Sequence, residues 1–449
     1  MKLKEIKKTM SDLSAKIYLV GGAIRDYLLG TELKDIDLVV SGPTKEIAER
    51  VATKINGSFV ILDEKRDMYR VVTANLIYDF SSLAGDTIEE DLQRRDFTIN
   101  AVALNISNAD NPTENWIDPL EGLKDIKEGK IKVVSDNSFR DDPLRILRMV
   151  RFKAQFGFTI EKVTKQLAEE SVSNLREIAN ERIKEELVRI GTYSQTDKNI
   201  ELLEKMGVIS ILLPRVDELK EFGVCKYHQE DVWTHSLTAV KKVEELVAKK
   251  YWANKITEDK IPLLKIAALL HDYGKLFTEK EIDGEIHFYG HQKVGVEKLR
   301  PLLKELTFSN QELDYILTLI RYHMRPFSLY RAENLTFKGK YRFFKAGGEV
   351  VEDICLLAAA DKMSTAELNN REQKMAEKLS FLQGLIADKE EFEAREKEKI
   401  ISGHDLMEEF DLVEGPGVGR VLEKINELQA QGKISTRKEA LKFAEQYIN

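Results

Sequence analysis

The sequence contains few of the residues that mark specialised classes of protein. Its 449 residues include 2 cysteines, 9 prolines and 25 glycines. The cysteines, Cys225 and Cys355, are too few for a disulfide framework or a thiolate zinc site, which favours a reducing compartment. The chain is 33% charged and 43% hydrophobic, and this balance excludes a collagen-like or wholly disordered protein.

Long apolar runs are also absent from the sequence. The first residues, MKLKEIKKTMSDLSAK, lack the apolar core of a signal peptide, and no run approaches the roughly 18 apolar residues of a membrane span. We therefore expect a cytoplasmic protein without a membrane partner. The net charge of -8 argues against a general nucleic-acid binder.

The pattern of apolar residues changes along the chain. Between Lys16 and Asn105, short β-branched runs alternate with turns, which predicts a small sheet with helices at Gly22–Leu29 and Thr44–Ile55. From about Asp141 onward, apolar residues recur at helical spacing. The predicted helices include DPLRILRMVRFKAQFGF, NERIKEELVRIGTY, NIELLEKMGVISILLP, THSLTAVKKVEELVAKKY and IPLLKIAALLHDYGK.

Two later segments have their own character. Residues 385–399 are rich in charge, and we interpret them as a helix or linker with a solvated face. The segment that begins ISGHDLMEEF predicts a small helical module at the end of the chain. Within it, GPGVG is typical of a turn and helix cap, although such a turn could also meet a phosphate.

A glycine turn and an acidic pair form the first group of candidate site residues. Gly21 and Gly22 follow a predicted strand and open a helix, where backbone N–H groups and Arg25 could bind a phosphate. Asp35 and Asp37 are two residues apart on the next predicted strand, so their side chains share one face. A pair of carboxylates in this arrangement suits Mg²⁺. Read singly, these motifs are also consistent with a structural turn and with solvated acids on an edge strand.

Further charged residues extend this group. Arg94 and Arg95, followed by Asn100, suggest a clamp for a triphosphate, and Asp79 is a candidate third carboxylate. A metal-binding pair, a phosphate turn and a cationic clamp together indicate nucleotidyl transfer.

The motifs GGAIRDYLLG, DIDLV, RRDFTINA, DDPLRILRMVRF and NERIKEEL occur in this order within residues 16–215. They resemble those of class II tRNA nucleotidyltransferases and the related bacterial poly(A) polymerases. The resemblance implies a polymerase-β-like head followed by a helical neck, body and tail, and template-free addition of C, C and A to the tRNA 3′ end from CTP and ATP. It implies that Asp35 and Asp37 bind Mg²⁺, and that Gly22, Arg25 and Arg95 contact sugar and triphosphate.

The family reads the incoming base with Glu-Asp-x-x-Arg, which here is Asp141-Asp142-Pro143-Leu144-Arg145. On a helix, Asp142 and Arg145 would lie on one face and offer an acceptor and a donor to a base edge. Arg148 and Arg151 continue that face and could reach phosphates. The alternative is an ordinary amphipathic helix with surface ion pairs.

The choice between C and A addition is left open by the sequence. Family members that add the complete CCA usually carry a long Arg/Pro-rich loop before RRDFT, whereas this chain has only FSSLAGDTIEEDLQ. The short loop resembles that of CC-adding enzymes, which leave the terminal A to a separate A-adding enzyme. The alternatives are full CCA addition, A addition and poly(A) synthesis.

Histidines define the second group, because all seven lie from His228 onward. The ordered set His235, His271-Asp272 and Asp361 resembles the four-ligand signature of HD phosphohydrolases over residues 228–365, although a lone core histidine is more often a satisfied polar group. The resemblance implies a divalent transition metal of unknown identity. It also implies phosphate contact by Lys275 and possible extra ligands for a second metal, His291 and His323. His228 and His287 receive no role, and His404 belongs to the terminal module.

The predicted fold class is α+β: a nucleotidyltransferase head with a small mixed sheet, then an all-α neck and body, an α-helical HD domain and a helical tail. We place the head at 1–139, the neck and body at 140–220, the HD domain at 221–384 and the tail at 385–449. Other readings are a hydrolase whose head only binds RNA, and a non-catalytic RNA-binding protein.

Local charge modifies the conclusion drawn from net charge. Residues 140–153 carry five basic and two acidic side chains, and Arg94 and Arg95 add two more cations near the proposed site. Phosphate affinity depends on such clusters. We therefore expect a confined basic groove and salt-sensitive binding of tRNA.

Overall fold

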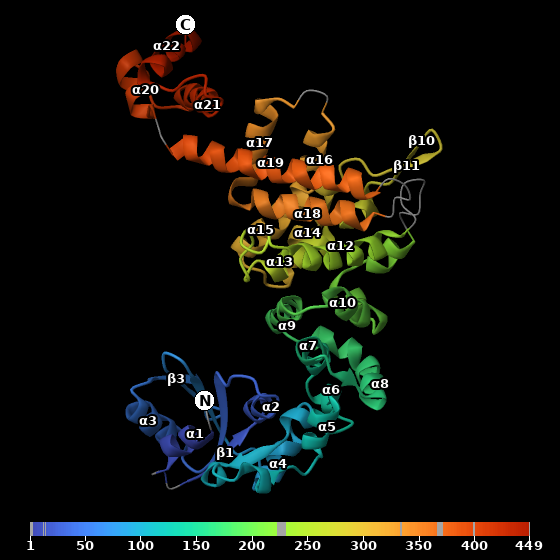
Figure 1. Cartoon of the computed structure of the whole chain (residues 1–449). Coiled ribbons are helices and arrows are strands. Elements are labelled where there is room, and N and C mark those ends of the chain that lie inside the picture. The colour runs from blue at the N-terminus through green and yellow to red at the C-terminus, as the bar shows by residue number, and fades with distance from the viewer. Residues whose placement is uncertain are drawn as a thin grey trace. The chain divides into compact units, whose positions relative to one another are not determined.

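The computed structural model, shown whole in Figure 1, describes residues 3–11, 13, 15–221, 230–332, 335–365, 371–397 and 400–448. Cys225 and His228 lie outside the described residues. The chain divides into two compact units. The first unit comprises residues 1–190 and 202–212, and the second comprises residues 191–201 and 213–449.

A seven-stranded mixed sheet forms the head of the first unit, with the strand order β3-β4-β5-β2-β1-β6-β7. The pairing of β2 with β5 is parallel and the others are antiparallel. The predicted run RVVTANLIYDF holds two of these strands, joined by a turn between Thr73 and Leu76. The strands are β1 (Lys16–Val20), β2 (Asp35–Ser41), β3 (Ser58–Asp63), β4 (Met68–Val72), β5 (Ile77–Ser82), β6 (Ala103–Asn105) and β7 (Trp116–Ile117). The prediction of a small mixed sheet is confirmed.

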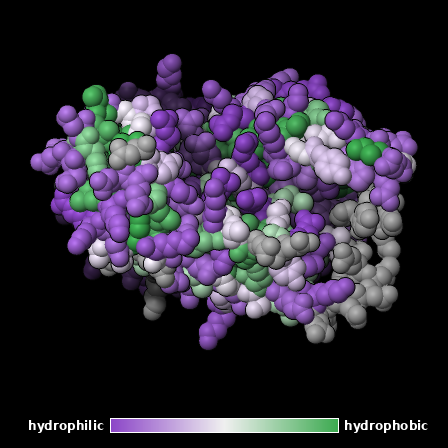
Figure 2. Space-filling model, turned by 90° about the horizontal axis from the view of Figure 1, so that it is seen from above, coloured by the Kyte–Doolittle hydropathy of each residue, from purple (hydrophilic) through white to green (hydrophobic). Residues whose placement is uncertain are grey.

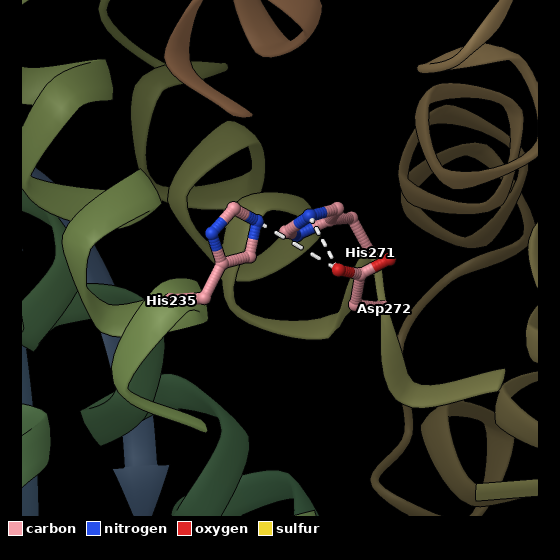
Figure 3. Close-up of side chains that lie close together, drawn as sticks. All are labelled: His235, His271 and Asp272. Atoms are coloured by element: carbon pink, nitrogen blue, oxygen red, sulfur yellow. Dashed lines mark ion pairs between the residues drawn. The ribbon is translucent and has the colours of Figure 1, made fainter. Parts of the chain in front are cut away.

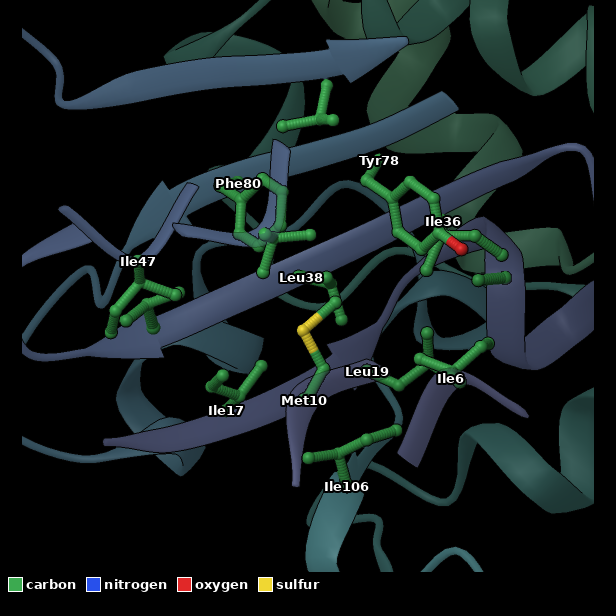
Figure 4. Packing of buried hydrophobic residues seen from close by; sticks show 14 of the residues in the cluster. Ile6, Met10, Ile17, Leu19, Ile36, Leu38, Ile47, Tyr78, Phe80 and Ile106 are labelled. Atoms are coloured by element: carbon green, nitrogen blue, oxygen red, sulfur yellow. The ribbon is translucent and has the colours of Figure 1, made fainter. Parts of the chain in front are cut away.

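Alternation along β2 decides which of its residues enter the main core. Ile36 and Leu38 are buried with residues of the first helices, as Figure 4 shows. Val39 belongs to a smaller apolar cluster, and Asp35 and Asp37 share its face because side chains alternate along a strand. The helices of the head are α1 (Leu3–Met10), α2 (Gly22–Leu28), α3 (Thr44–Ile55), α4 (Ile88–Gln93) and α5 (Gly122–Glu128), with the 3₁₀ helices η1 (Thr98–Asn100), η2 (Ile106–Asn108) and η3 (Pro112–Glu114).

The helical segment after the head differs from the predicted helices at two places. Asp142 has extended backbone, φ −146° and ψ 97°, and separates two helices. Gly207, at φ 82°, interrupts the predicted helix NIELLEKMGVISILLP. The elements are α6 (Ser138–Asp141), α7 (Arg145–Phe156), α8 (Lys162–Ser171), η4 (Val172–Glu177), α9 (Asn180–Thr192), α10 (Thr196–Lys205) and α11 (Val208–Leu212), and β8 (Lys130–Ile131) pairs with β9 (Thr159–Ile160).

Helices dominate the second unit, and ten of the 14 residues of α18 (Val351–Ser364) are buried. A hairpin of β10 (Lys280–Ile282) and β11 (Glu285–His287) departs from the predicted all-helical pattern. It turns at Asp283 and Gly284, whose φ values of 54° and 75° suit a tight hairpin. The remaining elements are η5 (Val216–Lys220), α12 (Val232–Val247), α13 (Ile261–Leu270), η6 (Tyr273–Phe277), α14 (His291–Glu305), α15 (Asn310–Tyr322), α16 (Arg325–Tyr330), α17 (Phe337–Gly347), η7 (Gly348–Val350) and α19 (Arg371–Lys397).

The charge-rich segment is a helix with a solvated face, as predicted, since Glu390 and Glu391 are exposed, but its other face is packed. It is the second half of α19, so the predicted boundary between residues 384 and 385 falls inside this helix. Lys389 is 5% exposed, and its Nζ lies 3.1 Å from both carboxylate oxygens of Glu352 on α18. Leu385 and Ile386 are also buried. Charge alone concealed the apolar residues that hold this helix in place.

Three terminal helices form a small module with its own apolar core. They are α20 (Gly403–Phe410), α21 (Pro416–Ala430) and α22 (Arg437–Ile448). Because α21 begins at Pro416 directly after Gly415, the turn-and-cap interpretation of GPGVG is confirmed. Among the helices that the structure describes, we find no apolar one of membrane-spanning length. The face seen in Figure 2 is mostly hydrophilic, with hydrophobic residues in small separate patches.

Candidate functional site

Three carboxylates meet where β2 and β5 run side by side in the first unit. Asp37 is the direct cross-strand partner of Asp79, whose carboxylate accepts hydrogen bonds of 2.7 and 2.8 Å from Arg70. Burial raises the pKa of Asp37, and the nearby carboxylates of Asp79 and Asp35 raise it further against the opposing charge of Arg95. A divalent cation relieves such repulsion, so this group of oxygens fits Mg²⁺.

The glycine turn lies directly beside Asp37. A Cβ atom at Gly21, whose φ is 64°, would lie 3.0 Å from Nη1 of Arg95 and 3.3 Å from Oδ2 of Asp37. At Gly22 it would lie 3.2 Å from Nη2 of Arg25 and 3.6 Å from the same carboxylate oxygen. The missing side chains therefore leave space where two arginines and an acid converge, as binding of a metal–triphosphate requires.

A chain of buried hydrogen bonds fixes Arg25 and reaches α7. Arg25 donates to Oδ1 of Asn100 at 2.6 Å, and Asn100 donates to Oδ1 of Asp96 at 3.0 Å. The other oxygen of Asp96 accepts from Nε and Nη2 of Arg148 at 2.9 and 2.6 Å. Asn100 was predicted to belong to a triphosphate clamp, and Asp96 was not predicted, although it follows the two arginines in RRDF. Both residues instead orient the cations around them.

Removing the Asp96 carboxylate leaves the partly exposed Arg148 and the buried Asn100 without their shared partner. Burial alone would raise the pKa of Asp96, but Arg148 and Asn100 hold it below its ordinary value. We expect Asp96→Ala to lower the free energy of unfolding by about 3 kcal/mol. This contribution is fully present above the unfolded-state pKa of about 4 and is lost as pH falls through the lower folded-state value. Urea unfolding at several pH values measures it, with Glu32→Ala, at an exposed acid of the same unit, as the control.

An Asp96 variant whose stability changes by less than about 1 kcal/mol at neutral pH would show that the pair is replaceable. A loss that persists unchanged below pH 3 would contradict the assigned direction of the pKa shift.

The two base-reading candidates are held in a geometry different from the predicted one. Asp142 lies ahead of α7, because a following proline disfavours helical backbone at the preceding residue. Its Oδ2 accepts from Nη2 of Arg182 at 3.0 Å. Arg145 donates to Oγ of Ser138 at 2.7 Å and to the carbonyl of Arg94 at 2.9 Å. Asp142 and Arg145 are therefore fixed by separate partners. The prediction that they share one face of a helix was wrong, because Asp142 lies outside the helix.

The remaining predicted arginines differ in how much their charge is matched. Arg95 is partly exposed, and its Nε and Nη2 donate to Oδ2 of Asp91 at 3.1 and 2.9 Å. Arg151 is 8% exposed, with Nε 3.1 Å from the carboxylate of the buried Glu186. Arg148 points to Asp96 as described. Phosphate contact by Arg148 and Arg151 remains a prediction, since in this structure both face acids of the protein.

In the second unit, the predicted histidines and aspartates come together in one place. Figure 3 shows His235, His271 and Asp272, whose Oδ2 lies 3.7 and 3.3 Å from the two Nε2 atoms. Nε2 of His235 is also 3.1 Å from Asp361. The second pair of predicted ligands adjoins this group: Nε2 of His291 lies 3.2 Å from Oδ1 of Asp272 and 3.4 Å from Nε2 of His323.

Backbone carbonyls set the orientation of three of these imidazoles. The Nδ1 atoms of His271, His291 and His323 lie 2.7, 2.9 and 2.7 Å from carbonyl oxygens three residues earlier. With Nδ1–H donating there, each neutral ring directs the lone pair of Nε2 toward the aspartates. Nε2 of His271 is buried without a hydrogen-bond partner among the described residues. These donors fit a divalent metal, and the overlapping ligand groups leave room for two.

The charges in this group also favour a bound cation. Burial opposes ionisation of Asp272 and Asp361, yet the neighbouring histidines hold the pKa of both well below the ordinary value. Burial likewise opposes protonation of His271, but the two aspartates raise its pKa to about 10. For His323, burial and the adjacent His271 and His291 lower the pKa to about 3. Two ionised carboxylates thus occupy a buried place, where a protonated His271 balances part of their charge and a bound metal cation could take its place.

A cavity of about 620 Å³ opens onto these ligands, and we call it the metal cavity. Lys275, predicted to contact phosphate, lines it with Nζ 2.6 Å from Oδ2 of Asp272. His287 also lines it and stacks on the ring of Tyr289, with centroids 5.1 Å apart. No role was predicted for His287. The exposed His404 lies 3.8 Å from Glu408 in the terminal module.

Family comparisons match the chain in three parts. Residues 17–132 match the poly A polymerase head domain, residues 157–220 match a "probable RNA and SrmB- binding site of polymerase A", and residues 232–366 match the HD domain. An A-adding tRNA nucleotidyltransferase of Deinococcus radiodurans is 30% identical over 96% of this chain and 95% of its own length. The chain belongs to the tRNA nucleotidyltransferase family.

Other relatives of this nucleotidyltransferase carry different names. A CC-adding enzyme of Thermus thermophilus is 31% identical over 94% of this chain and 92% of its own. A multifunctional CCA protein of Legionella pneumophila is 33% identical over 69% of this chain and 74% of its own length. The fold resembles that of a Thermotoga maritima CCA-adding enzyme solved with tRNA, with a TM-score of 0.64, 23% identity, and coverage of 100% of this chain and 95% of that one.

Proposed function

We propose that this enzyme adds C residues to the 3′ end of tRNA in a Mg²⁺-dependent reaction. The observation that carries the proposal is the convergence of Asp37, the Gly21–Gly22 turn, Arg25 and Arg95 within a few ångströms. Mg²⁺ held by Asp35 and Asp37 would neutralise the triphosphate and favour deprotonation of the terminal hydroxyl of the tRNA.

The surrounding residues act before and during that transfer. The glycine turn admits the triphosphate, because no side chain occupies the space beside Asp37. Arg25 and Arg95 enter the reaction already oriented, by Asn100 and Asp91 respectively. Such preorganised cations bind the phosphates and stabilise the charge that develops on the departing pyrophosphate.

Asp142 and Arg145 are proposed to select the base. Both cytosine and adenine present an exocyclic amino donor beside a ring acceptor, which a carboxylate and a guanidinium can pair with. The same two residues can therefore pair with cytosine and, after a shift in their position, with adenine. The hydrogen bonds from Arg182 and to Ser138 are proposed to hold these side chains in place.

The connection between β5 and α4 supports CC addition over complete CCA addition. It comprises residues 83–87 and has no arginine or proline. Side chains of α4 fasten it, since Asp91 accepts from the backbone N–H of Ala84 at 3.2 Å and Glu90 accepts from that of Asp86 at 2.9 Å. A fastened connection offers little freedom to re-form the base site for ATP. A separate A-adding enzyme would then complete the tRNA.

The decisive experiment supplies purified enzyme with tRNA that lacks its 3′ CCA. We expect labelled CTP with Mg²⁺ to extend it by two residues, and later addition of ATP to leave the product length unchanged. Extension by one more residue would establish complete CCA addition instead. Incorporation of ATP alone into tRNA already ending in CC would favour the A-adding activity of the Deinococcus relative, and long A tails on generic RNA would favour a poly(A) polymerase.

The second unit is proposed to be a metal-dependent phosphohydrolase. Four ligands, His235, His271, Asp272 and Asp361, would hold the first divalent ion, and His291 with His323 would help to hold a second. The metal would supply a nucleophilic hydroxide at neutral pH. Hydrolysis would add water to phosphorus, break the bond to the sugar oxygen and leave a proton on that oxygen. Lys275 at the cavity wall is placed to bind the phosphate.

A further inference from the structure

A second cavity of about 460 Å³ lies on the second unit, between the start of α14, the end of α15, and α16 and α17. We call it the basic groove. Its walls carry four cationic side chains and no carboxylate side chain. The four cations are Lys293, Arg321, Arg325 and Arg342. Neither the family matches nor the mechanism above gives these residues a task.

The cations of the basic groove are unneutralised. Each of the four is exposed, and none of them has a side-chain hydrogen bond or ion pair with any residue that the structure describes. Other arginines of the chain differ in this respect. Arg148 and Arg215, for example, each pair with a carboxylate at 2.6 Å. Four like charges around one cavity repel one another, so an anion that enters the groove is stabilised by all of them.

The basic groove begins where the metal cavity ends. Met324 lines both cavities. Lys293 lies two residues after the ligand His291, and Arg321 and Arg325 each lie two residues from the ligand His323. On a helix, residues two apart point to nearly opposite faces, so the groove lies around the helix surface from the metal ligands, with Met324 between the two cavities. An extended anion with one phosphate at the metal cavity can pass over Met324 and place a later phosphate in the groove.

An aromatic residue specifies the kind of polyanion. Tyr322 lines the basic groove together with the cations and is partly exposed, whereas Phe343 is buried beneath it. Guanidinium groups bind phosphates through paired hydrogen bonds, and aromatic rings stack on unpaired bases. Duplex RNA hides its bases, whereas a single strand exposes both bases and phosphates. We propose that the basic groove binds the backbone of a single-stranded RNA whose terminal phosphate enters the metal cavity. This inference rests on the proposed phosphohydrolase function and names its substrate class.

The test compares two substrates in the full-length enzyme loaded with Mn²⁺. One is a short single-stranded oligoribonucleotide that ends in a 2′,3′-cyclic phosphate, and the other is the corresponding cyclic mononucleotide. For the double variant Arg321→Glu, Arg325→Glu, we expect KM for the oligoribonucleotide to rise about tenfold or more and its salt dependence to weaken. Hydrolysis of the mononucleotide should stay within about twofold, because it does not reach the groove.

Lys249→Glu, Lys304→Glu is the matched control. It makes the same change in charge at exposed residues of the second unit that line neither cavity. An equal rise in KM for the oligoribonucleotide in this control would show that the change comes from the overall charge of the protein, and it would overturn the proposal. An unchanged KM for the oligoribonucleotide in the groove variant would overturn it as well, as would an equal loss on both substrates.

A second readout does not depend on hydrolysis. An oligoribonucleotide carrying 4-thiouridine is irradiated with the enzyme in EDTA, and the cross-linked peptides are identified by mass spectrometry. We expect adducts on the peptide that contains Tyr322, lost in the groove variant and retained in the control. If these adducts form but no substrate is hydrolysed, the phosphohydrolase function fails while RNA binding stands. Adducts confined to other parts of the chain would overturn the groove assignment.

Discussion

The Asp37→Asn variant is expected to lose nucleotide incorporation into tRNA by about a thousandfold or more. Asp37 lies beside the glycine turn and both arginines, so its carboxylate is the group best placed to hold Mg²⁺ against the triphosphate. Metal stabilisation of transferring phosphates is worth several kcal/mol, and each 1.4 kcal/mol changes a rate tenfold. Asparagine keeps the size of the side chain but removes the charge. The measurement is the single-turnover rate with labelled CTP and saturating Mg²⁺.

Companion variants separate this role from folding. Asp63→Asn changes a partly exposed acid at the end of β3 and should retain full activity. Asp79→Asn tests the third carboxylate, and we expect a smaller loss because Arg70 already occupies both of its oxygens. The rate of the double variant Asp35→Ala, Asp37→Ala should lie within about tenfold of the rate of Asp37→Asn, since the two carboxylates act as a unit. Asp37→Asn retaining a tenth of the activity would contradict the assignment.

Much of the head was predictable because its strands follow local rules. The alternation in DIDLVV placed Ile36 and Leu38 in the core and Asp35 and Asp37 on the other face, as the structure shows. The turn that divides β4 from β5 was missed, since RVVTANLIYDF has only the short segment TANL to mark it. The glycine turn was predictable for a similar local reason, because only glycine accommodates both the positive φ of Gly21 and the close approach of Asp37.

Contacts between distant residues were not predictable in the same way. Asp96 and Arg148 are 52 residues apart, and no periodicity connects them, yet their pairing links the arginine of α2 to α7. Pro143 could have warned that Asp142 would lie outside the helix, because the residue before proline avoids helical backbone. The burial of Lys389 depends on Glu352 of another helix, so counting charge in residues 385–399 could not reveal it.

The metal centre shows how the two kinds of information combine. The motif assigned His235, His271, Asp272 and Asp361 as ligands, and the structure brings their donor atoms within 3.1–3.7 Å of one another in the described pairs. The sequence could not show that carbonyls three residues back would fix three imidazoles. That detail decides the ring orientation, and it gives His291 and His323 the same geometry as His271.

The Asp272→Asn variant is therefore expected to lose both bound metal and phosphohydrolase activity, by about a thousandfold in rate. Asp272 is the group that adjoins most of the others, since its two oxygens lie 3.3 Å from His271 and 3.2 Å from His291. The amide removes a negative charge from a buried place and adds a donor that faces the ligating nitrogens. Metal content by mass spectrometry and hydrolysis of p-nitrophenyl phosphate measure the two losses.

Transfer of CMP to tRNA by the same preparation supplies the internal control. The carboxylates proposed for transfer lie in the first unit and those of the metal centre in the second, so the Asp272→Asn variant should retain nucleotide incorporation within about twofold. His404→Ala, which removes an exposed histidine of the terminal module, should alter neither activity. Full metal content in Asp272→Asn would contradict the ligand assignment. Loss of both activities with a native circular dichroism spectrum would instead show that the two centres depend on each other.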